Sequence, residues 1–434
     1  MDRDADPLAR PLVPRSVAVV GAGWAGLAAA VEATRAGHRV TLFEMAPHAG
    51  GRAREVRHDG LVLDNGQHIL IGAYTQTLRL MREVGVDTEA ALLRTPLRLT
   101  EPDGRGLHLP PGPPVIAFAR GVWGRAGWSL RERLSLLAAA TGWAARGFRC
   151  DPAATVESLS LGLGETIARD LIDPLCVAAL NTPANEASAA VFLRVLRDAL
   201  FSGPGSADLL LPRVSLGDLF PVPATSWLQR HGAVVQTATR VRELARDGAG
   251  WRVDGAAFDR VVLATPPAEA ARLVEPINAT WSASAAAFGY EPIVTVYLQC
   301  ESTSLPEPML ALRAGDDAPA QFVLDRGQLG GPKGLLAFVI SGARLWVEAG
   351  RDATLAATLR QARHSLGTLL RGTPEARLLI TEKRATFRCV PGLERPPMAI
   401  APGLLAAGDH VEGPYPATLE GAVRSAVGAV DALA

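Results

Sequence analysis

The amino-acid sequence predicts an α/β protein whose parallel sheet takes strands from both ends and the middle of the chain. Three observations favour this fold class. A short apolar run at residues 17–20 leads directly into a glycine-rich turn and an Ala-rich helical stretch. A second apolar run at 39–43 completes that unit, and similar runs return at 259–265 and 403–407. Continuous apolar runs of this length are typical of strands buried on both faces of a parallel sheet.

Length and composition exclude several classes of protein. The chain has 434 residues, of which 48% are hydrophobic and 20% charged, so it is too apolar to be disordered. Its 44 basic and 44 acidic residues cancel, whereas a nucleic-acid partner calls for a basic excess. Cys150, Cys176, Cys300 and Cys389 form no CxxC pair and have no histidine cluster beside them. We therefore expect no metal centre, and reduced cysteines.

We do not expect the N-terminal segment to be a secretory signal. Residues 1–15 are charged and contain prolines, and they lack the apolar core of a secretory leader. No apolar run approaches the ~20 residues that a membrane-spanning helix requires. The sequence therefore predicts a cytoplasmic protein, one that could still reach the inner membrane as a peripheral protein.

Residues 16–44 form a strand–helix–strand unit with a phosphate-binding turn. Gly21 allows the tight exit from the first strand, Gly23 leaves the backbone open to a pyrophosphate, and Gly26 lets helix and strand approach. The helix N-terminus offers free N–H groups and a positive dipole end to a phosphate. Glu44 ends the second strand, where a carboxylate accepts hydrogen bonds from ribose hydroxyls. The unit predicts a Rossmann-type dinucleotide site.

A second glycine pair indicates which dinucleotide is bound. Gly50, Gly51 and Arg52 follow the acidic strand after a short loop. They resemble the Gly-Gly-Arg motif of the flavin-dependent amine oxidase and phytoene desaturase superfamily. The resemblance implies a GR2-like flavoprotein with FAD as its cofactor, in which Arg52 is a counter-charge to the phosphates. A solvated loop arginine is the alternative for Arg52.

The C-terminal segment carries a further part of this resemblance. Gly408 and Asp409 end a short apolar strand, and a helix begins at 418–420 after a proline-containing loop. In the superfamily, this aspartate binds the ribityl chain or a phosphate, and the helix directs its N-terminus at the flavin ring. Capping of a turn is the alternative role for Asp409.

The rest of the chain leaves the cofactor domain twice. We expect an FAD-binding domain made of residues 1–73, 213–275 and 397–434. A discontinuous, mixed α+β substrate domain comprises 74–212, which is mostly helical, and 276–396, where strand-like runs return. In the part at 213–275 we expect one helix at 216–230. The resemblance also implies that the backbone of Val241 faces the adenine.

The stretch 115–149 combines aromatic residues with arginines. It contains Phe118, Trp123, Trp128, Trp143 and Phe148, together with Arg120, Arg125, Arg131, Arg133, Arg146 and Arg149 and a single acid, Glu132. This combination suits an element at a membrane surface, with Trp at headgroup depth and Arg toward anionic lipid. A helical pair that packs on the core and exposes a solvated arginine face is the alternative.

The most specific segment is LDNGQHILIGAY at 63–74. It closely resembles the motif of the bacterial hydroxysqualene dehydroxylases, also named squalene-associated FAD-dependent desaturases. The segment YPATLEGAVRS at 415–425 resembles that group too, although His410 stands where a Trp is expected. The resemblance covers 17–430. It implies reductive removal of an allylic hydroxyl from hydroxysqualene to give squalene, a C30 isoprenoid of hopanoid biosynthesis, with contacts to squalene-pathway enzymes.

The resemblance also implies a set of cofactor-binding residues: Gly21, Gly23, Trp24, Ala25, Gly26, Glu44, Gly50, Gly51, Arg52, Gly66, Gln67, His68, Val241, Gly408, Asp409, Thr418, Leu419 and Glu420. With one dinucleotide fingerprint, taken by FAD, the electrons come from transiently bound NAD(P)H or from a separate reductase.

The implied reaction demands a long apolar tunnel, an acid that protonates the leaving hydroxyl, and exclusion of water from the allylic cation. His68 is the first candidate for the acid because the resembling motif lies near the flavin. Asp64 and Gln67 would orient it, and Tyr415 and His410 are alternatives. Core packing or contact with FAD alone is the competing role for His68.

Two other functions remain open. One is a polyene desaturase or amine oxidase on the same scaffold, for which Lys333 and Lys383 matter because amine oxidases of this superfamily often use a lysine. The other is a membrane-bound carrier that retains FAD structurally.

Overall fold

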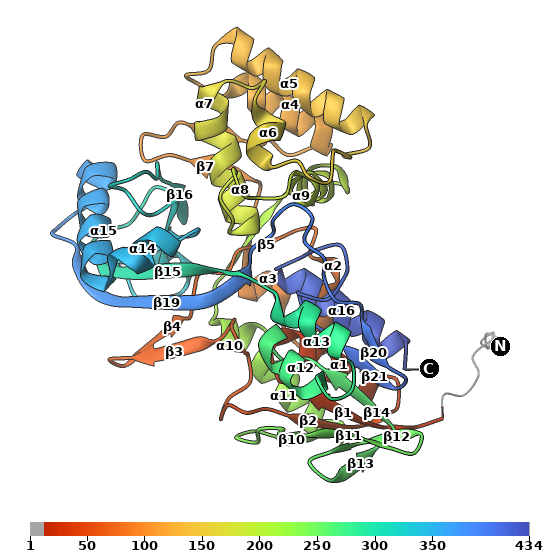
Figure 1. The fold of residues 1–434 in the computed structure, drawn as a ribbon. Coiled ribbons are helices and arrows are strands. Elements are labelled where there is room, and N and C mark those ends of the chain that lie inside the picture. The colour runs from red at the N-terminus through yellow and green to blue at the C-terminus, as the bar shows by residue number, and fades with distance from the viewer. Residues whose placement is uncertain (1–12, 434) are drawn as a thin grey trace, which may run out of the picture.

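The computed structural model describes residues 13–433. Most of the segment in which no secretory leader is expected therefore lies outside the described residues. Within them, Figure 1 shows three parts: a six-stranded sheet with its helices, a second sheet with two helices, and a lobe of helices at the end of the molecule opposite the first sheet.

The six-stranded sheet has the strand order β10-β2-β1-β14-β21-β20. Its strands are β1 (Ser16–Val20), β2 (Arg39–Phe43), β10 (Val234–Gln236), β14 (Arg260–Leu263), β20 (Ala399–Ala401) and β21 (Leu404–Ala406). All neighbours are parallel except the edge pair β20 and β21. The predicted α/β class with a parallel sheet from both ends and the middle of the chain is confirmed.

Helices cover both faces of this sheet because its central strand is apolar on both sides. Val17 and Val19 of β1 join the core with α1 (Trp24–Arg35), α11 (Pro221–Arg230) and α16 (Leu419–Asp431). Ala18 and Val20 join the core on the other face, with α12 (Pro267–Val274) and α13 (Ala279–Ala286). That second core also includes a three-stranded sheet of β11 (Leu244–Asp247), β12 (Gly250–Val253) and β13 (Ala256–Phe258).

The second large sheet is antiparallel, in the order β16-β17-β18-β15-β19. Its strands are β15 (Tyr290–Gln299), β16 (Met309–Ala311), β17 (Phe322–Asp325), β18 (Leu335–Ile340) and β19 (Glu375–Phe387), with a 3-10 helix at Arg326–Leu329. In β18 the residues at 336, 338 and 340 pack with α14 (Arg344–Ala349) and α15 (Arg351–Leu366). The alternate residues, at 335, 337 and 339, pack toward the segment 61–71.

The helical lobe contains α4 (Pro114–Gly124), α5 (Leu130–Ala145), α6 (Val156–Ser160), α7 (Glu165–Ile167), α8 (Asp173–Leu180) and α9 (Ala189–Phe201), with a π-helical turn at Ala168–Ile172. Its core takes in Phe118, Trp128 and Trp143, which are 9%, 5% and 5% exposed. The expectation that the tryptophans of this stretch lie together at headgroup depth is therefore wrong for Trp128 and Trp143, because the lobe needs large apolar side chains to fill its interior. Trp123 is exposed.

The short strands between residues 70 and 212 were not expected. The remaining elements are β3 (Glu55–His58), β4 (Leu61–Asp64), β5 (Leu70–Ile71), α2 (Thr75–Glu83), α3 (Thr88–Ala91), β6 (Leu92–Thr95), β7 (Arg98–Thr100), β8 (Gly106–His108), β9 (Leu209–Pro212), α10 (Leu216–Leu219) and a 3-10 helix at Gly367–Leu369. Strands of two to four residues are too short to show alternation. The single helix predicted at 216–230 is wrong, because Pro221 cannot continue α10 and begins α11 instead.

Across residues 13–433, the helices are either too short or too polar to cross a bilayer.

Candidate cofactor and active site

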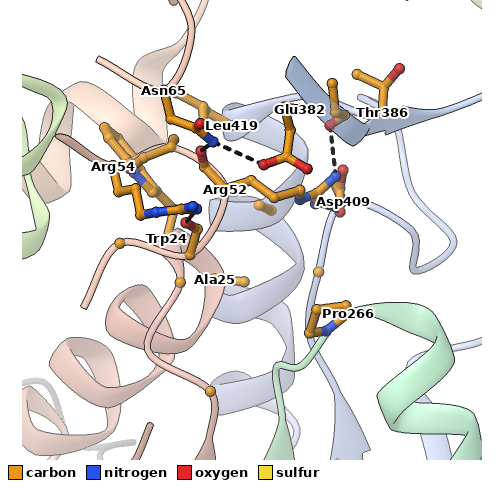
Figure 2. A pocket seen from close by; sticks show the side chains of 18 of the residues that line it. Trp24, Ala25, Arg52, Arg54, Asn65, Pro266, Glu382, Thr386, Asp409 and Leu419 are labelled. Atoms are coloured by element: carbon orange, nitrogen blue, oxygen red, sulfur yellow. Dashed lines mark hydrogen bonds and ion pairs between the residues drawn. The ribbon is translucent and has the colours of Figure 1, made fainter. Parts of the chain in front are cut away.

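A cavity of about 650 Å³ lies where the six-stranded sheet, the second sheet and the helical lobe meet. Its walls come from segments that are distant in sequence. Most of the predicted cofactor-binding residues line it: Gly21, Gly23, Trp24, Ala25, Glu44, Gly50, Gly51, Arg52, Gly66, Gln67, His68, Val241, Gly408, Asp409, Thr418 and Leu419. Gly26, Asp64, Tyr415 and Glu420 are not among the lining residues. Figure 2 shows part of the wall, with Arg52 and Asp409 close together.

Two glycines of the turn, Gly21 and Gly26, leave no space for a side chain. Gly21 has a φ of +102°, and a Cβ there would lie 2.6 Å from the carbonyl oxygen of Ala264. A Cβ on Gly26 would lie 1.7 Å from the carbonyl oxygen of Gly21. The absence of a side chain at Gly26 therefore allows the strand and the helix to pack closely. Gly21 instead lines the cavity.

Glu44 and Val241 also line the cavity, and Glu44 lies beside the glycine turn. The carboxylate of Glu44 accepts hydrogen bonds from the N–H groups of Ala22, at 2.6 Å, and Ala46, at 2.8 Å. These two bonds hold the carboxylate beside the glycine turn, where the sequence predicts that it binds ribose. The carbonyl of Val241 accepts a hydrogen bond from Arg272 at 3.1 Å.

Arg52, which is half-buried, and Asp409, which is buried, form an ion pair in the cavity wall. A guanidinium nitrogen of Arg52 lies 2.6 Å from a carboxylate oxygen of Asp409, and another donates to the carbonyl of Ala385 at 2.9 Å. Burial acts to raise the pKa of Asp409, but the charge of Arg52 and the neighbouring His410 outweigh it and hold this pKa well below its usual range. Asp409 is therefore ionised at neutral pH. It neutralises part of the charge of Arg52, which the sequence predicts to be the counter-charge to the phosphates.

Two polar atoms of the cavity wall have no protein partner. The Nε2 of His410 and the Oγ1 of Thr265 are buried and make no hydrogen bond within residues 13–433, although both residues line the cavity. Buried polar atoms without partners are costly, so these two atoms fit a site that a bound polar group completes. Together with the glycine turn and Glu44, they make the cavity suitable for FAD.

His68 lines the part of the cavity next to Gly66. Its Nδ1 lies 3.2 Å from the carbonyl oxygen of Gly66. A carbonyl only accepts, so Nδ1 carries the proton of this hydrogen bond and Nε2 is left for another partner. Burial lowers the pKa of His68, with the Gly66 hydrogen bond acting against the shift. The neutral imidazole is thus the resting form at neutral pH.

Gln67 and Asp64 belong to a network that runs away from His68. The amide nitrogen of Gln67 donates to the hydroxyl of Tyr297 at 2.7 Å, and Arg326 donates to the amide oxygen at 3.1 Å. The Tyr297 hydroxyl donates in turn to the backbone carbonyl of Asp64 at 2.9 Å. The Asp64 carboxylate accepts from the N–H of Leu216 at 2.8 Å. These bonds fix the turn that carries His68, instead of contacting its ring as expected.

Tyr415 and Glu420 make contacts of a different kind. The Tyr415 ring lies 4.9 Å from the guanidinium carbon of Arg424, and burial raises its pKa. The Glu420 carboxylate accepts hydrogen bonds from the backbone N–H of Thr77, at 2.9 Å, and from Arg424, at 2.7 Å. Glu420 therefore connects the start of α16 to α2, whereas Tyr415 lies against α16 itself.

The structure adds polar residues that sequence reasoning did not single out. Glu382 on β19 lines the cavity, and its carboxylate accepts a hydrogen bond from the amide of Asn65 at 2.9 Å, as Figure 2 shows. The same amide donates to the backbone carbonyl of Arg52 at 3.0 Å. Lys383, the next residue, is exposed, as is Lys333. Leu378 and Ile380 pack toward the segment 61–71, and alternation along β19 extends this face to Glu382.

Part of the remaining wall of the cavity is apolar, beside the polar residues Asn181, Ser341 and Thr386. Its side chains come from the 65–69 turn, from α8 in the helical lobe, and from three strands of the second sheet: Ile69, Ala178, Ala179, Ile293, Phe322 and Val339. This wall adjoins the part that holds His68 and Glu382. The cavity can therefore hold an apolar molecule against one polar end.

Comparisons with known proteins place these features in context. The family model described as flavin containing amine oxidoreductase matches residues 24–434. The chain is 26% identical to hydroxysqualene dehydroxylase of Sinorhizobium fredii, over 96% of this chain and 98% of that protein. It is 29% identical to the protein of the same name from Rhodopseudomonas palustris, with the same two coverages. An oxidoreductase structure from Methanosarcina mazei has the same fold, with a TM-score of 0.72, 16% identity, and coverage of 96% of this chain and 100% of that one.

Proposed function

This chain belongs to the family of flavin containing amine oxidoreductases, and from that premise we propose that it removes the allylic hydroxyl of hydroxysqualene to give squalene. It is an FAD-dependent oxidoreductase. The proposal of the reaction is carried by the similarity to hydroxysqualene dehydroxylases over nearly the whole of both chains. The apolar wall beside a polar end is the second support. Desaturation of a polyene and oxidation of an amine are the alternatives.

When FAD is bound and reduced, it supplies the hydride. The protein has to hold the isoprenoid, exclude water and deliver one proton. Ile293, Phe322 and Val339 offer an apolar surface on which the isoprenoid chain can lie, and on which no water is held by hydrogen bonds. The C–O bond then breaks, the hydroxyl leaves as water, and a C–H bond forms at the allylic carbon.

We assign the proton to Nε2 of His68. Because Nδ1 is bound to the Gly66 carbonyl, only the doubly protonated ring can donate at Nε2. Burial lowers the pKa of His68, so the donating form is populated more at acidic pH. Turnover limited by this proton should fall as the pH rises through the pKa of His68. Asp64 and Gln67 hold the turn in place, and Tyr415 positions the start of α16.

Glu382 is the competing proton donor in the same wall. A pH profile of kcat separates the two residues. If His68 donates, His68→Gln slows turnover and abolishes the pH dependence above, whereas Glu382→Gln keeps it. If Glu382 donates, Glu382→Gln slows turnover and abolishes the pH dependence, whereas His68→Gln keeps it.

The central test uses the FAD-loaded enzyme, photoreduced without oxygen and mixed with hydroxysqualene. We expect squalene and oxidised flavin in equal amounts. Failure to form squalene, together with reduction of the oxidised enzyme by phytoene or by an amine, would contradict the proposal. Repeating the reaction with NADH, NADPH or a reductase in place of light identifies the electron donor, which we propose to be one of these.

A further inference from the structure

The outer surface of the helices α4 and α5 is unusually apolar for a face that no other element within residues 13–433 covers. Five large apolar side chains on these helices are between 49% and 59% exposed: Val115, Ile116, Trp123, Leu130 and Leu134. We call these five residues the hairpin surface. Single exposed apolar residues are ordinary, but a cluster on two adjacent helices indicates an interaction site.

Helix α5 is apolar on both of its faces. Leu136 and Trp143, seven residues apart, are buried in the core of the lobe. Leu130, Leu134 and Ala138, each four residues apart, are exposed on another face. A helix that serves only to cover a core has polar residues on its outer face. The outer face of α5 therefore has a function beyond packing.

Exposed arginines lie in the same stretch of the chain as the hairpin surface. Arg120, Arg131 and Arg149 are exposed, and none of them forms an ion pair with a carboxylate in residues 13–433. Glu132 is the one acid in the stretch 115–149, and its carboxylate is used to cap α5, accepting from the N–H of Ser129 at 2.6 Å. Apolar residues with unpaired arginines beside them complement an anionic lipid surface, in which both find partners.

We propose that the hairpin surface docks on a lipid bilayer that contains anionic headgroups, without crossing it. Trp123 and the leucines would enter the headgroup region, and the arginines would lie against the lipid phosphates. Figure 1 shows α4 and α5 at the end of the molecule opposite the six-stranded sheet, so a bilayer there leaves the nucleotide end free. The same lobe contributes Ala178 and Ala179 to the apolar wall of the cavity.

The test is flotation of the FAD-loaded protein with vesicles of phosphatidylcholine alone or mixed with phosphatidylglycerol. We expect binding to the mixed vesicles that weakens at high salt. Arg131→Gln combined with Arg149→Gln should weaken it about 25-fold, because each arginine near an anionic surface contributes about fivefold. Trp123→Ser combined with Leu134→Ser should weaken binding to both kinds of vesicle about tenfold or more.

Matched controls come from exposed residues elsewhere. Leu345→Ser removes an apolar side chain that is 73% exposed on α14, and Arg230→Gln with Arg371→Gln removes two exposed arginines. These variants should bind as the wild type does. Flavin absorbance and the melting temperature show whether each variant is folded. The salt dependence of vesicle binding by the wild type tests the role of charge without any variant.

Three results would overturn the proposal: a wild type that binds neither kind of vesicle, hairpin variants that bind as well as the controls, or a dimer without lipid that Trp123→Ser dissociates. The last result would assign the surface to a second copy of the chain. Flotation uses no isoprenoid, so its failure leaves the proposed reaction untouched, and failure of the reaction leaves the docking result untouched.

Discussion

Replacement of Asp64 by asparagine should change how folding stability depends on pH. Asp64 is 3% exposed, and burial raises its pKa from 3.8 to about 6, against the Leu216 hydrogen bond and the charge of Arg326. Between these two pH values the folded protein holds a proton that the unfolded chain has lost. The stabilisation is thus fully present below the unfolded pKa and is lost as the pH rises through the folded pKa.

The magnitude follows from the size of this shift. Each pH unit corresponds to about 1.4 kcal/mol, so crossing the whole window costs the wild type about 3 kcal/mol of unfolding free energy, of which about 2 kcal/mol falls between pH 4 and pH 7. Asparagine keeps an oxygen for the N–H of Leu216 and gives up only the 3.9 Å ion pair with Arg326. The stability of Asp64→Asn relative to wild type should therefore rise by about 2 kcal/mol over that range.

The assay is guanidinium unfolding of the FAD-saturated proteins at half-unit steps from pH 4 to pH 7, followed by circular dichroism. The difference between variant and wild type isolates Asp64 from the other carboxyl groups that titrate in the same range. Asp316→Asn, at an exposed site, is the control and should leave the difference flat. Parallel curves for wild type and Asp64→Asn would refute the reasoning, because they would show that the folded and unfolded states hold the Asp64 proton alike.

Three further predictions concern the cofactor end. Gly26→Ala should yield protein without flavin absorbance, because its Cβ would lie 1.7 Å from the Gly21 carbonyl oxygen; normal flavin content would contradict this. Arg52→Met should lower the unfolding free energy by about 3 kcal/mol, measured by chemical denaturation, because it leaves the Asp409 carboxylate buried without its partner; Arg52→Lys should recover part of the loss. Glu420→Gln should cost about 2 kcal/mol and leave the flavin spectrum unchanged, since the side chain binds α2; a shifted spectrum would place it at the flavin.

The part of the cavity around the glycine turn could be predicted from the sequence, because its contacts are local. Gly21, Gly23 and Glu44 belong to one strand–helix–strand unit, in which spacing alone determines geometry. Leu419 lines the cavity as predicted, while Glu420 beside it faces α2. In a helix, successive residues point about 100° apart, so a motif that identifies a helix N-terminus does not say which of its side chains meets the ligand.

The cavity wall that contains Glu382 was harder to predict from the sequence, because it depends on the register between strands that are distant in the chain. Glu382 reaches the cavity through the pairing of β19 with β15, in which Ile293 lies opposite Glu382. That pairing includes a bulge between Glu291 and Ile293, which no pattern in the sequence marks. A shift of one residue would have turned Lys383 inward in place of Glu382. Asn65, which holds Glu382, lies in the specific motif but was not assigned a role.

Substrate preference can change at the apolar wall of the cavity without changing the part that binds the cofactor. The glycine turn and Glu44 are held by bonds within the cofactor domain, and Gly26 and Gly21 accept no side chain. Phe322 and Val339 lie on neighbouring strands whose other faces pack against α14 and α15, so their size can change without moving the glycine turn. A family that keeps one cofactor and acts on different substrates would vary this wall first. In the present chain these two positions are apolar, which favours an isoprenoid over a cationic amine.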